Sequence, residues 1–343
     1  MKLQRILTFL GISFSLLLGF FGQQSVQAAD GPEYYLRAMS TNSAQTASNG
    51  YYKIRTIPGG KQEVQVQIGN KKNSAIKLQL DVNTAYTQNS GIYGWNRKKV
   101  PADTTRQYNL ADLVQPRSQT VTIPAKGTVV AKFTLTPPSK AYSGIIMGGI
   151  YTTPMDGTRV SVNANTALSI KYSYAVPIVL KMDNVLAVPS LTALSARGGI
   201  HSGATAVLAK IQNPKPALLD NATMNLSVTR RGSSTVLHAT KGSGLIIAPN
   251  SNFDYPIDWG GDRLEAGDYT LHGTASNGSQ SWKFTRNFTI SASEADQLNR
   301  EAGFKPNYLW LWITLGVLAL ILLILLVFWL GRRSSKKKTD SNE

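Results

Sequence analysis

Two runs of alternating apolar and polar residues decide the fold: Glu63-Val-Gln-Val-Gln-Ile68 and Ile76-Lys-Leu-Gln-Leu-Asp-Val82. In each run, every second residue is Val, Ile or Leu, and the residues between them are polar. Successive side chains of a β-strand point to opposite faces, so this alternation is typical of strands with one buried and one wet face. Turn signals at Pro58-Gly59-Gly60 and Gly69-Asn70 separate the runs from their neighbours. The stretch therefore predicts two strands of an antiparallel sheet.

The same pattern recurs along most of the remaining chain. Strands are predicted at 120–123, 129–135, 145–151, 159–163 and 167–174, then at 175–180, 205–212, 223–229, 235–239, 253–257, 268–274, 281–284 and 286–291. Short strands at this spacing predict an all-β fold of two tandem immunoglobulin-like β-sandwich domains. Ser293 and Asp296 have the spacing of a capping box, which predicts a short helix from Ser293 to Ala302.

A run of 22 uncharged residues, Leu309–Leu330, follows this helix, and 16 of them are Leu, Ile, Val or Phe. As a helix it would extend roughly 33 Å, enough to cross a bilayer core. Aromatic rings favour the headgroup layer and basic residues favour the cytoplasmic side. The residues expected at the membrane interface are Tyr308, Trp310, Trp312, Trp329, Arg332 and Arg333. The sequence thus predicts one C-terminal transmembrane helix with the preceding chain outside.

The N-terminus agrees with this orientation. Lys2 and Arg5 precede an apolar stretch, and small residues before Asp30 predict signal peptidase cleavage after Ala28, with an uncleaved anchor as the alternative. We therefore expect a single-pass type I protein. Its predicted parts are a signal peptide at 1–28, a first β-sandwich at 29–165, a second at 166–292, a short helical juxtamembrane linker at 293–307, the transmembrane helix at 308–330 and a cytoplasmic basic tail at 331–343.

Composition narrows the class of protein. The chain has no cysteine, which excludes disulfides, thiolate catalysis and thiolate metal ligation, and which fits an exported Gram-positive protein. The predicted outer part carries a net charge of +10 before Pro177 and +2 after it. A positive field attracts polyanions, and outside such a cell these would be teichoic acids and wall glycans, not nucleic acid. A generally solvated basic surface is the alternative.

No arrangement of residues indicates catalysis, a metal or a cofactor. The three histidines, His201, His238 and His272, lack metal-ligand spacing, and the sequence contains no nucleophile elbow, HExxH or phosphate loop. The densest group of acids is Asp254, Asp258, Asp262, Glu265 and Asp268. Because its first members lie in a strand pattern, strand and turn positions are favoured over a calcium loop. We predict a protein that is not an enzyme.

One polar segment combines aromatic and basic residues and is the candidate contact for a glycan or polyanion. Aromatic faces stack on sugar rings, and nearby cations pair with carboxylate or phosphate groups. The alternative is that the rings only close one end of the sandwich. The candidate residues are Tyr86, Tyr93, Trp95, Arg97, Lys98, Lys99, Arg106 and Tyr108.

Several blocks of the sequence resemble one known family, in order along nearly the whole mature chain. They include Tyr51–Asn70, Asn83–Gly91, Tyr142–Ile150, Ala248–Ser251 and Gly267–Leu271. These blocks are similar to those of the WxL-interacting proteins, Gram-positive surface proteins with a peptidoglycan-binding domain, a host-binding domain and a C-terminal membrane helix. The chain has no Trp-x-Leu pair itself. The resemblance therefore implies an anchor for WxL-domain proteins.

The leading hypothesis is a non-enzymatic, membrane-anchored scaffold and adhesion protein. It would bind WxL-type surface proteins, peptidoglycan or anionic wall polymers, and host extracellular matrix, and would need no cofactor. The alternative is a wall-glycan binding module without protein clients. A third hypothesis, a wall hydrolase, needs paired carboxylates, which are scarce in the first domain. An open strand edge or a loop end of a sandwich is expected to receive a protein partner.

Overall fold

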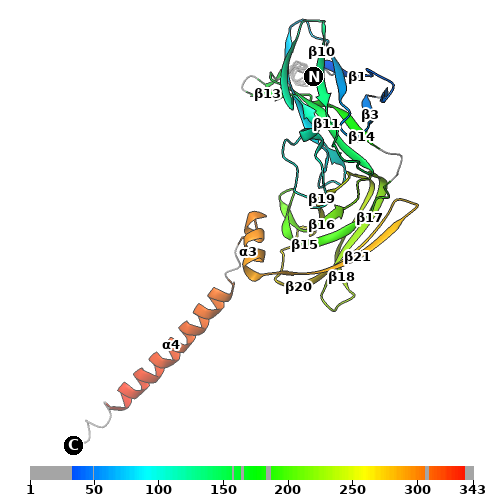
Figure 1. Ribbon diagram of the computed structural model, residues 1–343. Helices are drawn as coiled ribbons and strands as arrows, with labels where there is room; N and C mark the ends of the chain where they lie inside the picture. Colours follow the sequence, from blue (N-terminus) through cyan, green and yellow to red (C-terminus); the bar gives the residue numbers. More distant parts are fainter. Residues whose placement is uncertain are drawn as a thin grey trace, which may run out of the picture.

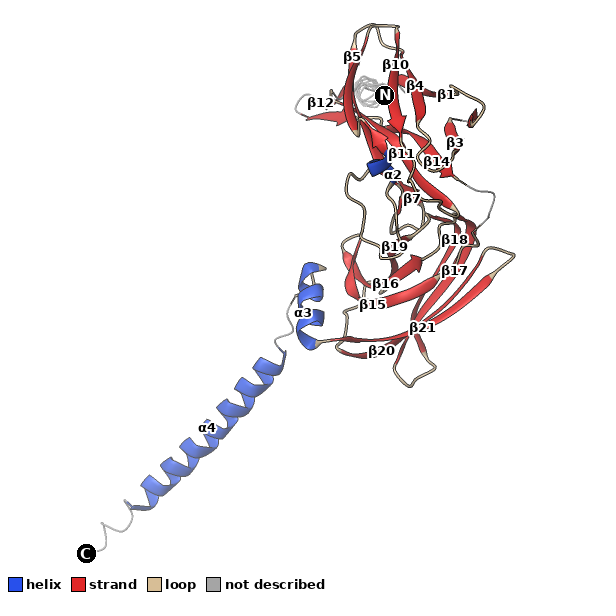
Figure 2. Ribbon diagram, in the orientation of Figure 1, coloured by secondary structure: helices blue, strands red, loops and turns tan. Residues whose placement is uncertain are grey.

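The computed structural model describes residues 33–48, 50–156, 158–163, 166–182, 187–305 and 309–336. Figures 1 and 2 show the β-sandwiches lying end to end, followed by helices in the C-terminal part. The prediction of two immunoglobulin-like β-sandwich domains and one C-terminal apolar helix is confirmed. The predicted signal peptide at 1–28 and the end of the basic tail lie outside the described residues.

The first sandwich packs a four-stranded sheet against a six-stranded one. The four-stranded sheet has the order β1 (Tyr34–Met39), β4 (Gln62–Asn70), β10 (Thr128–Leu135) and β8 (Val114–Gln115). The six-stranded sheet has the order β2 (Gln45–Ser48), β3 (Tyr51–Arg55), β14 (Tyr174–Lys181), β11 (Ile145–Pro154), β5 (Ile76–Thr84) and β9 (Ser118–Ile123). Smaller elements are the hairpins β6 (Tyr86–Thr87) with β7 (Tyr93–Gly94) and β12 (Thr158–Asn163) with β13 (Thr166–Ile170), and the short helix α2 (Leu110–Leu113).

The alternation in the sequence builds the core of this sandwich. Strands β4 and β5 lie in different sheets and point their apolar residues at each other. Burial of each such side chain contributes about 1.5–3 kcal/mol. Six of the predicted inward-facing residues are 0% exposed: Val64, Val66, Ile68, Leu78, Leu80 and Val82.

Strand β14 completes the first sandwich, although the predicted border at 165/166 places it in the second domain. It pairs antiparallel with β11 and parallel with β3, where Ile178 lies opposite Tyr52. The strand is apolar on both faces, since Val176 and Ile178 are buried in the core and Pro177 and Val179 are half-buried on the outer face. Nothing in its composition therefore marks it off from the strands that follow.

The second sandwich has a three-stranded and a four-stranded sheet. The first has the order β15 (Thr192–His201), β16 (Ala204–Asn213) and β19 (Ser251–Asp258). The second has the order β18 (Val236–Ile247), β17 (Leu219–Arg230), β20 (Gly267–Ser276) and β21 (Ser281–Ile290). Strand β15 was missed by the sequence pattern, and β21 is one strand where two were predicted. The core of the second sandwich contains the buried rings of Trp259, Tyr269 and Phe288.

The predicted short helix is α3 (Ala292–Glu301), but its N-cap is Ser291 and not Ser293. The Ser291 hydroxyl accepts a hydrogen bond from the Glu294 backbone N–H at 3.2 Å. Helix α3 is held to the second sandwich by Asn299, which is 2% exposed. Its side-chain amide bonds both the N–H and the carbonyl oxygen of Leu264, at 2.8 and 2.9 Å.

The last described element is α4 (Leu309–Lys336), which contains the predicted apolar run. Its residues Leu311–Trp329 are long and apolar enough to cross a membrane, and none of this stretch is buried against the rest of the protein. Trp312 and Trp329 lie at the two ends of this stretch, 70% and 55% exposed. Tyr308 and the side chains of Trp310, Arg332 and Arg333 lie outside what is described.

Candidate binding surface at the sandwich junction

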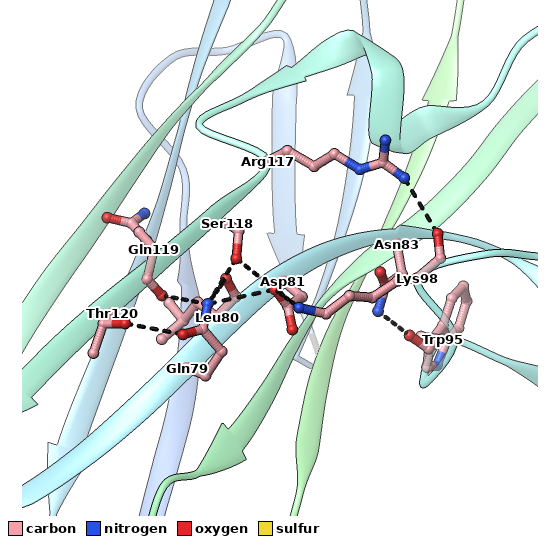
Figure 3. Close-up of polar contacts among 10 residues, drawn as sticks. All are labelled: Gln79, Leu80, Asp81, Asn83, Trp95, Lys98, Arg117, Ser118, Gln119 and Thr120. Carbon is pink, nitrogen blue, oxygen red and sulfur yellow. Dashed lines mark hydrogen bonds and ion pairs between the residues drawn. The ribbon is translucent and has the colours of Figure 1, made fainter.

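The segment between β5 and α2, which contains all eight candidate contact residues, lies on the outer face of the six-stranded sheet. Figure 3 shows how polar side chains of β5 hold it there. Asn83 donates to the Trp95 carbonyl oxygen at 2.6 Å, and the Lys98 ammonium lies 3.0 Å from the Asp81 carboxylate. Arg117 donates to the Lys98 carbonyl oxygen at 3.2 Å. The segment is thus a fixed part of the sandwich surface.

The candidate aromatic residues are packed to different degrees. Tyr86 is 1% exposed, its hydroxyl bonds Asn96, and the Arg97 guanidinium lies 4.7 Å from its ring centroid. Burial raises the pKa of Tyr86, and the nearby Arg97 partly offsets this rise. Because its ring is covered, Tyr86 supports the segment and offers no face to a sugar. Tyr93 and Trp95 are half-buried, with ring centroids 4.8 Å apart.

The five remaining candidates also separate into two groups. Arg97, Lys98 and Lys99 are exposed and form a short cationic patch, the Arg97–Lys99 patch. Arg106 is half-buried and donates to the Pro101 carbonyl oxygen, and Tyr108 packs edge to face on Tyr142 with centroids 5.4 Å apart. Among the candidate residues, the patch keeps its charged groups exposed to a polyanion, and the Lys98 ammonium is at the same time paired with Asp81.

The same segment reaches the second sandwich through a carboxylate that sequence reasoning did not single out. Asp103 accepts hydrogen bonds from the Gln212 amide at 3.0 Å and from the Asn252 amide at 2.8 Å. Both amides belong to the second sandwich and are 6% exposed. Burial alone would raise the pKa of Asp103, but hydrogen bonds from Thr105, Asn252 and Gln212 outweigh it and hold this pKa below its ordinary value. We call this contact the Asp103 clasp.

A second group of hydrogen bonds lies next to the clasp and also joins the two sandwiches. Asn250 lies in a turn with a left-handed φ of 47°, which asparagine tolerates. Its amide donates to the carbonyl oxygens of Thr105 and Pro214, at 3.1 and 3.0 Å, and its oxygen accepts from Tyr142 at 3.2 Å. Burial raises the pKa of Tyr142 to about 12. The sandwiches are therefore joined by a bonded interface.

An apolar groove of about 740 Å³ lies beside this junction, and both sandwiches line it. The first sandwich contributes Tyr51, Tyr93, Pro177 and Val179, and the second contributes Leu218. Met147, which is 7% exposed, lies at its base. Lys53 and Asp220 supply one charge of each sign. We call this the junction groove. One sequence signal could have revealed this groove. Strand β14 is apolar on its outer face as well as its inner face, which indicates that other residues cover both faces of the strand.

Four of the five clustered acids of the second sandwich, Asp254, Asp258, Glu265 and Asp268, are paired with bases along the strands and turns. Asp254 lies 2.5 Å from Arg197, Asp258 lies 2.8 Å from His201, and Asp268 lies 3.4 Å from Arg231. Across the part of the chain that the structure describes, no group of three or more His, Cys, Asp or Glu side chains could hold a metal ion.

These features define a protein of two β-sandwich domains. Hydrogen bonds join the domains, and both domains line a groove at their junction. The chain belongs to the WxL-interacting protein family. Residues 34–153 match the family profile described as "WxL Interacting Protein, peptidoglycan binding domain", and residues 163–300 match "WxL Interacting Protein, host binding domain". The resemblance stated from the sequence is thereby confirmed.

Solved structures with similar folds include two chaperones and a pilin–chaperone complex. The YadV chaperone is 13% identical, with 75% of this chain and 100% of that chain covered and a TM-score of 0.29. The Salmonella enterica SafA pilin–SafB chaperone complex is 14% identical, with 76% and 98% covered and a TM-score of 0.29. The Pseudomonas aeruginosa CupB2 chaperone is 12% identical, with 70% and 97% covered and a TM-score of 0.27. Likeness at this level carries no conclusion about binding. A comparison with curated protein sequences found no match.

Proposed function

We propose that the chain is a non-enzymatic scaffold that holds WxL-type proteins at the surface of a Gram-positive bacterium. In this proposal α4 crosses the cell membrane once in type I orientation, and the basic first sandwich faces the cell wall. The partners are WxL-domain proteins, peptidoglycan or other anionic wall polymers, and host extracellular matrix. Family membership and the apolar stretch Leu311–Trp329 support the proposal.

The junction groove is the observation that carries the client-binding part of the proposal. Side chains i and i+2 of an extended segment point to the same face, about 6.8 Å apart. The Trp and Leu of a client's Trp-x-Leu segment would therefore enter the groove together, against the rings of Tyr51 and Tyr93. Because Leu218 of the second sandwich completes the groove, this site needs both domains.

The Arg97–Lys99 patch carries the wall-binding part. Its three cations are exposed on a segment that β5 holds in place, so binding an anionic polymer requires little ordering of the loop. The half-buried Trp95 ring lies beside the patch. The alternative, a wall-glycan module without clients, uses this patch alone and assigns no role to the junction groove.

A single substitution tests the client site. Val179→Glu places a carboxylate in the apolar groove, and Val130→Glu is the matched control, 40% exposed on β10 in the opposite sheet. We expect Val179→Glu to weaken binding of a purified WxL-domain protein to the detergent-solubilised full chain by at least about tenfold. Covering an unpaired carboxylate costs more than the ~1.4 kcal/mol that this factor represents.

The control variant should bind like the wild type. Unchanged affinity of Val179→Glu, with an unchanged unfolding midpoint, would remove the junction groove from the proposal. If the wild type binds walls but no WxL-domain protein, the module without clients is the correct function.

The wall site is tested by charge. Serine at Arg97, Lys98 and Lys99 should reduce the fraction of protein retained on purified cell walls. The control removes the same charge elsewhere on the first sandwich, with serine at the exposed residues Arg37, Lys61 and Lys140. Equal loss of retention in the two triple variants would show that net charge, and not the Arg97–Lys99 patch, accounts for wall binding.

A further inference from the structure

The second sandwich has its own candidate site, on the outer face of the sheet β18-β17-β20-β21. A shallow groove of about 560 Å³ crosses all four strands there. It lies on the second sandwich only and shares no residue with the junction groove. Neither the Arg97–Lys99 patch nor the proposed client site depends on it.

The strand register places the polar side chains of this groove in two rows across the sheet. In one row, Lys241 lies opposite Asn225, Asn225 opposite Thr274, and Thr274 opposite Lys283. Neighbouring strands lie about 4.8 Å apart, so the backbones of the two lysines are separated by roughly 14 Å. The row is a polar floor with one cation at each end.

The second row runs parallel to the first, two residues further along each strand. It contains Ala239, Ser227, His272 and Thr285, again in register across the four strands. These side chains are short apart from His272, whose ring lies 3.4 Å from the Thr229 hydroxyl. The short residues of the two rows leave a trough beside the long lysines, and the hydroxyl, amide and imidazole groups of the two rows are hydrogen-bonding partners for sugar hydroxyls.

The charge of the groove is not neutralised. Lys241 and Lys283 are exposed and make no ion pair with any described residue, and no acid lines the groove. Asp268, near one end of β20, is engaged by Arg231 at 3.4 Å and by the Thr289 hydroxyl at 2.5 Å. The domain as a whole carries nearly as many acids as bases, so this face is a local positive site in a near-neutral domain.

We propose, on the basis of the host binding in the proposed function, that this groove binds an acidic polysaccharide of the host, a chain of sugar rings that carries sulfate or carboxylate groups. Lys241 and Lys283 would pair with acid groups about three strand spacings apart, and the two polar rows would bond the ring hydroxyls between them. The rows favour sugar rings over a simple polyol phosphate, since they offer many neutral hydrogen-bonding groups and two cations. Among the described residues that line the groove, Phe284 is the one Phe, Tyr or Trp, and it is buried, so recognition rests on charge and hydrogen bonds and not on stacking.

The test measures heparin binding by the full chain in detergent, with neutral dextran and a teichoic acid as further probes. Lys241→Ser with Lys283→Ser should weaken heparin binding by up to about thirtyfold, as two exposed charge contacts of up to about 1 kcal/mol each predict. Ala239→Glu, an acid placed in the exposed floor, should weaken it at least as much. Lys61→Ser with Lys140→Ser removes the same charge from the first sandwich and should leave heparin affinity within twofold of wild type.

Four results would overturn the proposal. One is heparin binding that neither the lysine pair nor Ala239→Glu changes. Another is equal weakening by the control pair, which would reduce the effect to net charge. The third is teichoic acid binding through Lys241 and Lys283 without heparin binding, which would assign the groove to a wall polymer. Binding of dextran as tight as heparin would also exclude the role given to the two lysines.

Discussion

Replacing Asp103 by asparagine should uncouple the two sandwiches. The substitution keeps the size of the side chain but removes its charge and one of its two acceptor oxygens. In the wild type these oxygens accept from Gln212 and Asn252 across the junction, at 3.0 and 2.8 Å. In the variant, the side-chain amide of either Gln212 or Asn252 faces the new NH₂ group of residue 103. Both groups are hydrogen-bond donors, so this hydrogen bond cannot form.

The size of the effect follows from this geometry. A hydrogen bond to a charged acceptor contributes about 1.5–3 kcal/mol, and a buried donor left without a partner costs about 1–3 kcal/mol. Gln212 and Asn252 are each 6% exposed, but Asp103 itself is only half-buried, so water can replace part of the loss. We therefore expect the coupling between the sandwiches to fall by about 2–4 kcal/mol.

Urea unfolding of the segment 33–305, followed by tryptophan fluorescence, measures this loss. Trp95 reports on the first sandwich, and Trp259 and Trp282 report on the second. Asp112→Asn is the control, because its side chain is 56% exposed and its ion pair with Arg117 is 3.4 Å long. It should change stability by only about 0.2–1 kcal/mol.

The clasp also has a pH dependence of known sign. The pKa of Asp103 is lowered in the folded protein, so its contribution is present above the ordinary Asp pKa and is lost as pH falls through the folded value. The wild type should thus lose domain coupling in acid, and Asp103→Asn should show a flatter acid profile. If Asp103→Asn lowers stability no more than Asp112→Asn and keeps the same acid profile, the reasoning about the clasp is refuted.

Three further predictions concern other parts of the chain. Asn299→Ala should lower the free energy of unfolding by about 2–4 kcal/mol in urea, because both polar groups of Leu264 lose their partner; Gln297→Ala on the exposed side of α3 should change it little. Burial raises the pKa of Tyr34 to about 12, so the contribution of Tyr34 to the free energy of unfolding is complete below pH ~10 and is lost as pH rises towards 12. Tyr34→Phe should abolish that part of the loss of stability at alkaline pH, measured by urea unfolding. Leu320→Arg should reduce recovery of the protein in the membrane fraction, since a central arginine costs about 2.5–3.5 kcal/mol on insertion, whereas unchanged recovery would argue against α4 as the anchor.

Local patterns in the sequence predicted the parts of the fold that depend on local rules. The alternation around Val64 and Leu80 is a property of neighbouring residues, and the buried faces follow from it. The turn at Asn250 and the apolar helix α4 are predictable for the same reason. Strand β15 lacks a regular alternation, since Gly198 and Gly199 interrupt it, and it could not be recognised in this way.

The candidate site was predictable only in part. The Arg97–Lys99 patch is exposed, as its polar surroundings indicate. Tyr86 was expected on the surface and is buried, because Arg97 and the strands beneath it cover its ring. The junction groove brings Val179 together with Leu218 from the other domain, and the groove in the second sandwich depends on the register of four strands. Such long-range pairings leave no periodic signal in a single sequence.

The position of β14 has a consequence for the order in which the protein matures. Tyr52 and Ile178 are register partners, although more than a hundred residues separate them, so the six-stranded sheet stays divided until that late segment arrives. A chain crossing the membrane N-terminus first would export most of the first sandwich before it can close. A fragment that stops at residue 153, where the family's first domain ends, lacks the middle strand and leaves β3 separated from β11. The smallest unit that folds as the first sandwich therefore extends to Lys181, beyond residue 153, where the match to the family profile ends.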